Sequence, residues 1–359
     1  MHEQVYHKDG QYNIYTFGDE VEDLVRNYDE DSDRPFFMFL APPQIHLPVH
    51  PDQEVMDAYA TELSGLSNEW RRKCGGLSIM LDKFVERVVN VLNETSYLEN
   101  TIIIYASDNG AQAEGSELGA GSNYPLRGSK GSSYEGANRV PSFVFSPLLG
   151  HVLGQGGGTF TRLFHVSDWL PTIVSGLLGR GDLLPDQLDG YDLWDPLLSG
   201  ACTTNGSDDS DDDECRSDRT VVLYNVDPFT GIAAIRNKRY KLIVNESDNV
   251  GWYDGETFGD LDFCYMTPTE SLELYDLNED EQERHNIYDD EPNIASELLD
   301  MIWLYRDLAV SSAYCDYSDD RAIEKWTYKD EVVPWMDDDE DFECPTVTTS
   351  SGVCSLIAH

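Results

Sequence analysis

Residues 101–106 constrain the fold of this chain more than any other stretch. The sequence there, Thr-Ile-Ile-Ile-Tyr-Ala, is a short uncharged run rich in β-branched and aromatic residues. Such a run is typical of a strand buried on both faces in a parallel sheet. It ends in Ser-Asp-Asn-Gly at residues 107–110. Because ligands bind at the carboxyl ends of strands in open α/β sheets, Asp108 and Asn109 are placed to face a site.

The chemistry of this turn leaves two interpretations open. The neighbouring oxygen donors of Asp108 and Asn109 suit a hard cation such as Ca²⁺ or Mg²⁺ better than zinc. The Gly/Ser-rich loop that follows carries Arg127 and Lys130, which could bring cationic donors to an anionic group. However, Asp-Asn-Gly is also a strong turn signal, and Gly/Ser-rich loops are often only flexible surface loops.

A strand and a long helix are expected before this run. Residues 35–41, Pro-Phe-Phe-Met-Phe-Leu-Ala, have the pattern of a buried strand, and residues 57–98 carry apolar side chains at helical spacing. Strand, helix and strand in this order predict a right-handed βαβ crossover between parallel strands. That arrangement places His46 at the same sheet edge as the turn at residues 107–110.

Two further histidine positions were weighed for chemistry. His50 lies four residues after His46, but Pro48 between them disfavours the single helical face that a zinc-binding pair needs. His165 and Asp168 resemble an acid/base pair, but helix-start capping by Ser167 or Asp168 is the favoured interpretation.

The second half of the chain changes character. Residues 140–146 predict another buried strand and residues 164–178 a helix. Short strands and a closing helix then predict a small antiparallel α+β subdomain at residues 220–226, 232–236, 240–244, 272–276 and 292–308. We therefore expect an α/β domain at residues 1–215, the antiparallel subdomain at 216–330 and an acidic tail at 331–359.

Several ordered sequence blocks resemble the sulfatase family, and within it the arylsulfatase B-like branch. They are Ser-Asp-Asn-Gly at 107–110, Asn-Tyr-Pro-Leu-Arg-Gly-Ser-Lys at 123–130 and Tyr-Glu-Gly-Ala-Asn-Arg at 134–139. Members of that family carry similar blocks in the same order. The resemblance implies an alkaline-phosphatase-like α/β fold, here incomplete: a mostly parallel sheet sandwiched by helices, with a small carboxy-terminal antiparallel α+β subdomain.

The resemblance also implies roles for individual residues. Asp108 and Asn109 would bind the active-site Ca²⁺, and Lys130 would contact the substrate sulfate. His46 matches a family histidine that follows a strand and also contacts the sulfate. We therefore take His46 and Lys130 as catalytic candidates, and His46, Lys130 and Arg127 as substrate-binding candidates.

Three elements of the family are absent from the sequence. Sulfatases hydrolyse sulfate esters with a formylglycine made from the Cys or Ser of a C/S-x-P-S/T-R motif, and no such motif occurs here. The paired acidic metal ligands of the family's first strand and its G-K-x-H block are also missing. The resemblance spans about residues 34–310, so we favour a truncated chain over a natural non-catalytic relative, and expect no turnover of sulfate esters by the chain as given.

The lineage predicts a sulfuric ester hydrolase, with two alternatives. One is a non-catalytic relative that binds a sulfate or glycan through Lys130, Arg127 and His46. The other is a metal-dependent phosphatase or phosphodiesterase of the same superfamily, although such sites generally add histidine ligands to two metals. A sulfated small molecule or sulfated glycan is the expected substrate.

Composition limits the partners and the route of the protein. The chain has 359 residues, with 24 Lys plus Arg against 68 Asp plus Glu, giving a formal charge of −44 that repels nucleic acid and anionic lipid surfaces. No apolar run approaches the roughly 20 residues of a membrane span, and the first ten residues lack the apolar core of a signal peptide. The seven cysteines contain no C-x-x-C pair, which leaves disulfides open. Sequons at Asn93, Asn205 and Asn245 predict glycosylation and a secreted or lysosomal-type route for the intact protein.

Overall fold

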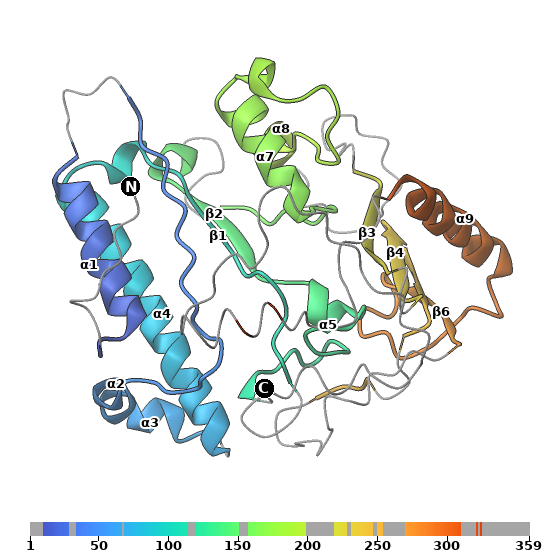
Figure 1. Ribbon diagram of the computed structural model, residues 1–359, viewed down its shortest axis with the longest axis horizontal. Helices are drawn as coiled ribbons and strands as arrows, with labels where there is room; N and C mark the ends of the chain where they lie inside the picture. The colour runs from blue at the N-terminus through green and yellow to red at the C-terminus, as the bar shows by residue number, and fades with distance from the viewer. Residues whose placement is uncertain are drawn as a thin grey trace.

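The computed structural model arranges the chain in three parts along its long axis (Figure 1). Helices α1 and α4 lie at one end, strands β1 and β2 in the middle, and a four-stranded sheet with helix α9 at the other end. The residues that the structure describes are 10–28, 34–66, 68–113, 120–150, 157–198, 219–227, 231–246, 250–253, 270–309, 321 and 324.

Helix α4 (Glu69–Glu94) forms the amino-terminal layer together with α1 (Asn13–Arg26). The Asn68 side chain caps α4 by accepting the Trp70 N–H at 2.7 Å, which satisfies one of the free donors of the first turn. The predicted apolar stripe is buried against α1 in a core that includes Ile14, Val21, Leu77, Met80 and Phe84. The helix predicted at residues 57–98 is interrupted, because α2 (Gln53–Ala58) and α3 (Ala60–Leu63) precede α4 as separate elements.

The strand pairing in the middle of the molecule differs from the prediction. Strand β1 (Ile103–Ala106) pairs antiparallel with β2 (Ser142–Phe145), with Ile103 opposite Phe145. Residues 35–41 are extended but belong to no β-ladder, and Phe37 and Phe39 are 81% and 82% exposed. The described strands therefore form no parallel pair, and the expected βαβ crossover is not formed among them.

The carboxy-terminal sheet agrees closely with the prediction. Its strands follow one another as an antiparallel meander: β3 (Val221–Val226), β4 (Ala233–Asn237), β5 (Tyr240–Val244) and β6 (Leu272–Asp276). Helix α9 (Pro292–Leu308) covers one face, packing Leu298 and Ile302 against Leu242. Because successive strand residues point to opposite faces, Ala234 and Ile243 lie on the other face, where they pack with Tyr134. This second face meets the rest of the molecule.

The connection between the two sheets is built from short helices. The helix predicted at residues 164–178 consists of the turns η5 (Val166–Asp168), α7 (Trp169–Pro171) and η6 (Thr172–Leu177), followed by η7 (Gly181–Leu183) and α8 (Trp194–Leu198). A further short helix, α5 (Glu135–Asn138), lies between β1 and the carboxy-terminal sheet (Figure 1). Among the helices of the described residues, none combines the length and apolar character needed to cross a membrane.

Candidate functional site

The polar turn after β1 is fixed to the segment around α5. The Gly110 N–H donates to Ala137 O at 2.7 Å. A Cβ at Gly110 would come within 1.8 Å of Gly136 O, so only glycine permits this close approach. The turn that carries Asp108 and Asn109 is therefore held in place, at its last residue, by the main chain of Gly136 and Ala137.

Within the turn, the two candidate metal-binding residues are accessible from solvent to different degrees. Asp108 is exposed and Asn109 is partly buried. The Asn109 N–H donates to Asp108 Oδ1 at 2.8 Å, and the Ser107 hydroxyl donates to Asn109 O at 3.0 Å. These local bonds stabilise the turn without burying the Asp108 carboxylate.

Asn123 joins this turn to the loop that carries Lys130. Its Oδ1 accepts the Ala111 N–H at 2.7 Å, while its Nδ2 donates to Ala111 O at 2.7 Å and to Gly128 O at 3.0 Å. The Lys130 N–H also donates to Ala111 O, at 3.1 Å. Ala111 directly follows the turn at residues 107–110. These bonds therefore place the main chain of Lys130 close to the end of the turn that carries Asp108 and Asn109.

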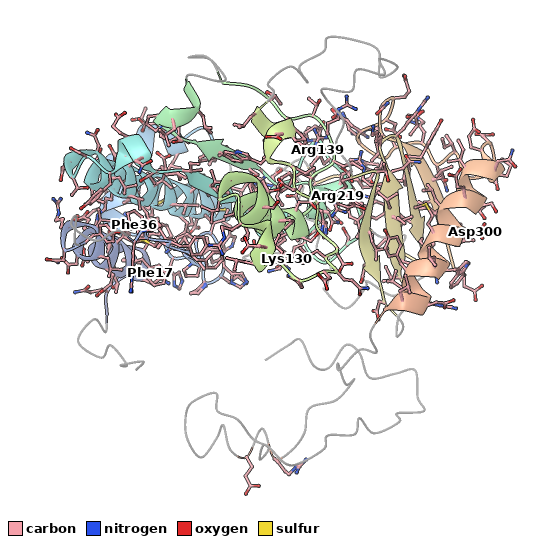
Figure 2. The ribbon with its side chains drawn as sticks, turned by 90° about the horizontal axis from the view of Figure 1, so that it is seen from above. Phe17, Phe36, Lys130, Arg139, Arg219 and Asp300 are labelled. Carbon is pink, nitrogen blue, oxygen red and sulfur yellow. The ribbon has the colours of Figure 1, made fainter. Side chains whose placement is uncertain are left out.

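The Lys130 side chain is a free cation within the described part of the chain. It is partly buried, and no carboxylate there forms an ion pair with its ammonium. Figure 2 shows Lys130 in the middle of the molecule, between the α1/α4 end and the four-stranded sheet. An ammonium with no ion pair in this part of the chain, on a residue whose main chain bonds to Ala111, is suited to bind an anionic group.

Arg127 lies instead in a buried interface. Its Nη1 donates to Glu273 Oε2 at 3.0 Å and to Tyr275 Oη at 2.7 Å, and its Nε donates to Val250 O at 2.9 Å. The guanidinium also stacks on the Tyr134 ring at 3.9 Å from the ring centre. The structure thus gives Arg127 an internal role, and its contact with a substrate stays a prediction.

His46 is exposed and has only local hydrogen bonds among the described residues. Its main-chain N–H donates to Pro43 O at 2.8 Å, and its Nδ1 lies 3.1 Å from Leu47 O. The preceding Gln44 donates to Asn13 Oδ1 at 2.7 Å, which ties this segment to α1. No hydrogen bond joins His46 to Lys130 or Asp108, so its place at the site stays a prediction.

The side-chain oxygen atoms of the turn match a divalent cation only in part. Asp108 and Asn109 supply the oxygen atoms that Ca²⁺ prefers. Among the described residues, however, no group of three or more His, Cys, Asp or Glu side chains could hold a metal ion. Because Ca²⁺ takes about six to eight oxygen ligands, the donors fit the ion in kind but not in number.

His165 and Asp168 form a structural cap. The His165 N–H donates to Asp168 Oδ2 at 2.7 Å, completing a capping box at η5. Asp168 is fully buried and pairs with Arg219 through two bonds, Nη2 to Oδ1 at 2.6 Å and Nε to Oδ2 at 2.7 Å. Burial and the nearby Arg219 charge lower the pKa of His165. The capping interpretation is confirmed, and Asp168 is committed to Arg219.

The predicted modification sites fall in different places. Asn93 is exposed near the end of α4. Asn245 follows β5, where its Nδ2 donates to Gly231 O at 3.0 Å. Asn205 and every cysteine except the buried, free Cys74 lie outside the described residues.

The sequence did not predict one group of buried charged side chains. Glu135, Lys241, Glu273 and Glu283 are each less than a tenth exposed. The one available signal was Lys241 itself, a lone charge inside the apolar strand sequence Tyr-Lys-Leu-Ile-Val. Nothing in its spacing identified its partners, because Glu135 and Glu283 lie far from it along the chain.

Comparisons with known proteins show which family the chain resembles. The Sulfatase family model matches residues 2–179. The chain is 29% identical over 332 residues to Arylsulfatase J from Mus musculus, covering 85% of this chain and 50% of that relative. It is 29% identical over 262 residues to Arylsulfatase A from Homo sapiens, covering 71% and 45% respectively. The chain thus spans about half the length of these relatives.

Solved structures give the same fold. The structure of Ps i-CgsB in complex with k-i-k-neocarrahexaose has a TM-score of 0.62 at 20% identity, over 83% of this chain and 55% of that chain. The PsFucS1 sulfatase from Pseudoalteromonas sp. has a TM-score of 0.55 at 21% identity, over 82% and 52%. These likenesses confirm the α/β fold class with its antiparallel carboxy-terminal subdomain.

Proposed function

Because the chain belongs to the sulfatase family, we propose that it carries the sulfate-recognising part of a sulfuric ester hydrolase of the arylsulfatase type. The observation that supports this most is the backbone junction at Ala111. There, main-chain and Asn123 hydrogen bonds join the loop that carries Lys130 to the residue that follows the Asp108–Asn109 turn, and the Lys130 ammonium has no ion pair among the described residues.

The chemistry of sulfate ester cleavage explains why these groups belong together. Attack at sulfur increases the negative charge on the sulfate oxygens and on the departing alcohol oxygen. A fixed cation such as Lys130 stabilises that charge, and a ring N–H of His46 would donate a hydrogen bond to it. A bound Ca²⁺ would supply further positive charge, and Asp108 and Asn109 would be two of its ligands.

The nucleophile is not part of this sequence. The C/S-x-P-S/T-R motif that yields formylglycine is absent from the chain. We therefore propose that the chain as given binds sulfate esters without hydrolysing them, and that Ca²⁺ binds weakly because affinity depends on the number of charged ligands.

The test is equilibrium binding of p-nitrophenyl sulfate to the purified chain in the presence of Ca²⁺. Lys130→Ala is expected to weaken binding about tenfold or more, the usual effect of losing a hydrogen bond to a charged group. Lys238→Ala removes an exposed cation from the β4–β5 turn and is the matched control. Release of p-nitrophenol by the wild-type chain would contradict the absence of turnover, and equal binding by the Lys130→Ala variant would contradict the site.

A second candidate function is non-catalytic binding of a sulfated glycan, favoured by the missing nucleophile motif. It predicts retention on a sulfated glycan resin at physiological salt, although the charge of −44 opposes strong binding of polyanions. A phosphatase or phosphodiesterase of the same superfamily predicts the opposite preference in a matched pair of ligands, namely tighter binding of p-nitrophenyl phosphate than of the sulfate.

We also propose a secreted or lysosomal-type route for the intact protein, on the basis of its sequons. Asn93 is the most accessible of the two described sites. Expression through a secretory pathway should give a glycosidase-sensitive mass shift that Asn93→Gln reduces. Absence of any shift would overturn glycosylation at that position.

A further inference from the structure

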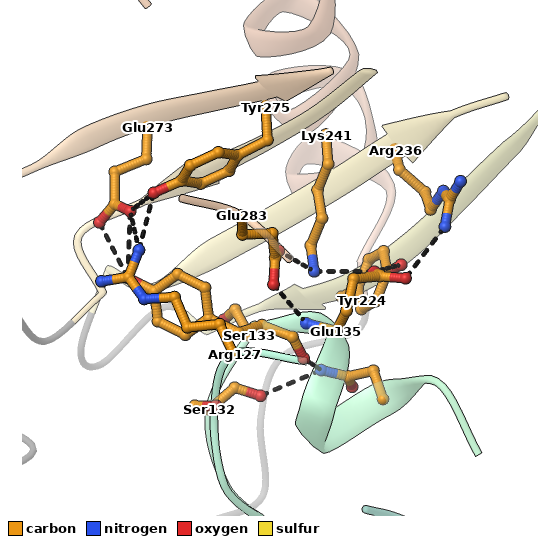
Figure 3. Close-up of polar contacts among 12 residues, drawn as sticks. Arg127, Ser132, Ser133, Glu135, Tyr224, Arg236, Lys241, Glu273, Tyr275 and Glu283 are labelled. Carbon is orange, nitrogen blue, oxygen red and sulfur yellow. Dashed lines mark hydrogen bonds and ion pairs between the residues drawn. The ribbon is translucent and has the colours of Figure 1, made fainter. Parts of the chain in front are cut away.

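The loop that presents Lys130 is anchored at both of its ends to strand β6 and to the segments that follow β5 and β6. The loop runs from Arg127 to Glu135, and Lys130 lies between the two anchors. Its partners come from residues more than a hundred positions later in the chain (Figure 3).

The first anchor is at Arg127 and Gly128. Arg127 pairs with Glu273 on β6, with side chains only 12% and 10% exposed. The next residue adds a main-chain bond, from the Gly128 N–H to Gly251 O at 2.9 Å. Gly128 has φ +100°, and a Cβ there would meet Tyr134 Cβ at 2.8 Å, so the backbone turns sharply as it leaves this anchor.

The second anchor consists of three consecutive residues, each bonded to a different buried carboxylate. The Ser133 N–H donates to Glu246 Oε2 at 2.6 Å. The Tyr134 hydroxyl donates to Glu273 Oε1 at 2.9 Å, and the Glu135 N–H donates to Glu283 Oε2 at 2.8 Å. Ser133, Tyr134 and Glu135 are themselves buried.

Lys241 on β5 organises this second anchor. Its Nζ lies 3.0 Å from Glu135 Oε1 and 2.8 Å from Glu283 Oε1, and its side chain is fully buried. Glu135 also accepts the Tyr224 hydroxyl at 2.5 Å and pairs with Arg236 at 3.2 Å. The Lys241 ammonium thus joins the Glu135 carboxylate to the Glu283 carboxylate, which also accepts the Glu135 main-chain N–H (Figure 3).

The energetic cost of burying these charged side chains indicates what they do in the structure. Removing charges from water is expensive, and apolar side chains of the same volume would often stabilise a protein as well or better. Charged groups do fix one geometry, since their hydrogen bonds are directional. What this geometry fixes is the path of the loop. Between the anchors lies the partly buried Lys130, whose ammonium forms no ion pair with any described residue.

We propose that Lys241 is a positioning residue for the sulfate site: by joining Glu135 to Glu283 it holds the loop that presents Lys130 beside Asp108 and Asn109. Lys241 itself does not touch the substrate. This inference rests on the proposed function, because it assigns a purpose to the position of Lys130.

The test combines hydrogen exchange with ligand binding on the full chain. Lys241→Met removes the ammonium but keeps the length of the side chain. We expect amide exchange in residues 128–136 to accelerate about tenfold or more, and binding of p-nitrophenyl sulfate to weaken. Arg239→Met is the matched control, because Arg239 pairs with Asp276 at the exposed end of the same hairpin and does not contact the loop.

A second variant separates positioning from folding. Lys241→Met combined with Glu135→Gln and Glu283→Gln removes the charges of all three residues together, so that only Arg236, whose side chain is 17% exposed, loses its Glu135 partner. This variant should melt closer to the wild type than Lys241→Met does. Positioning predicts that its loop still exchanges rapidly and that its binding stays weak. Wild-type exchange and wild-type affinity in the triple variant would overturn the inference.

The two proposals fail in different ways. If the wild-type chain does not bind p-nitrophenyl sulfate, the proposed function fails, while the exchange data still report whether Lys241 fixes the loop. If the wild type binds and the variants keep both slow exchange and full affinity, only the positioning role fails.

Discussion

Asp108 and Asp168 show how one residue type takes opposite roles in this chain. Each lies beside a polar turn, and each was a candidate for chemistry from sequence alone. Asp108 is exposed and accepts its neighbour's N–H, whereas Asp168 is fully buried against Arg219. The difference arises from Arg219, which lies 51 residues away from Asp168 and has no signature in the local pattern.

The buried pair makes a prediction about stability. Asp168→Asn should lower the free energy of unfolding by about 3 to 5 kcal/mol, because it removes the buried carboxylate that accepts two hydrogen bonds from the Arg219 guanidinium. Urea unfolding measures this. Asp182→Asn is the control, since Asp182 and Arg180 form an ion pair in which both side chains are more than half exposed, and its stability should change little. Equal effects of the two substitutions would contradict the role given to Asp168.

At the scale of elements, the sequence predicted the carboxy-terminal strands and helix α9 well, whereas the helices predicted at residues 57–98 and 164–178 are divided into shorter elements. The four strands of the carboxy-terminal sheet and helix α9 lie within about one residue of their predicted bounds. Their signals are local: apolar residues at regular spacing, with Pro292 at the start of α9.

The pairing of the strands in the middle of the molecule could not be predicted on the same basis. Residues 35–41 have the composition of a buried strand, but a strand exists only where a partner completes its hydrogen bonds. Among the described residues no partner lies beside them, so Phe37 and Phe39 face solvent. Composition predicted the extended backbone, and pairing was decided by residues distant in the sequence.

The anchor at Glu135 predicts a specific dependence of stability on pH. Burial alone would raise the pKa of Glu135, but Lys241 and Arg236 beside it lower the pKa from 4.5 to about 2. A carboxyl with a lowered pKa in the folded state stabilises the protein above its ordinary pKa, and this stabilisation is lost as the pH falls. The wild type should therefore lose stability between about pH 4.5 and pH 2 through this group.

The measurement is chemical unfolding as a function of pH for the wild type and Glu135→Gln. At neutral pH the variant should be less stable by about 3 kcal/mol, since one pKa unit corresponds to about 1.4 kcal/mol. The gap should close as the pH approaches 2. Glu281→Gln, which removes an exposed carboxylate paired with Arg139, should follow the wild-type curve. A gap that stays constant with pH would contradict the account of the anchor.

On the scale of the whole molecule, the central strands are less covered than those at the carboxy-terminal end. Strand β2 leaves Phe143 and Phe145 about half exposed, and the neighbouring segment leaves Phe37 and Phe39 almost fully exposed. Large exposed apolar areas are unusual on soluble monomers. The isolated chain should therefore bind a hydrophobic dye.

This surface can be tested by substitution. Phe37→Ser with Phe39→Ser should lower dye fluorescence more than Leu304→Ser with Leu308→Ser, which changes the exposed side of α9. The α9 pair is the control, because it alters exposed apolar residues away from the central strands. An equal or larger decrease for the α9 pair would contradict an uncovered central layer.

The measurement that tests the central claim most directly is a titration of the amide resonances of the full chain with p-nitrophenyl sulfate, in wild type and in Lys130→Ala. The account predicts shifts at residues 107–111 and 128–131, which meet at the Ala111 hydrogen bonds, and their loss in the variant. Shifts confined to other residues, or the same shifts in Lys130→Ala, would show that the anion is recognised elsewhere.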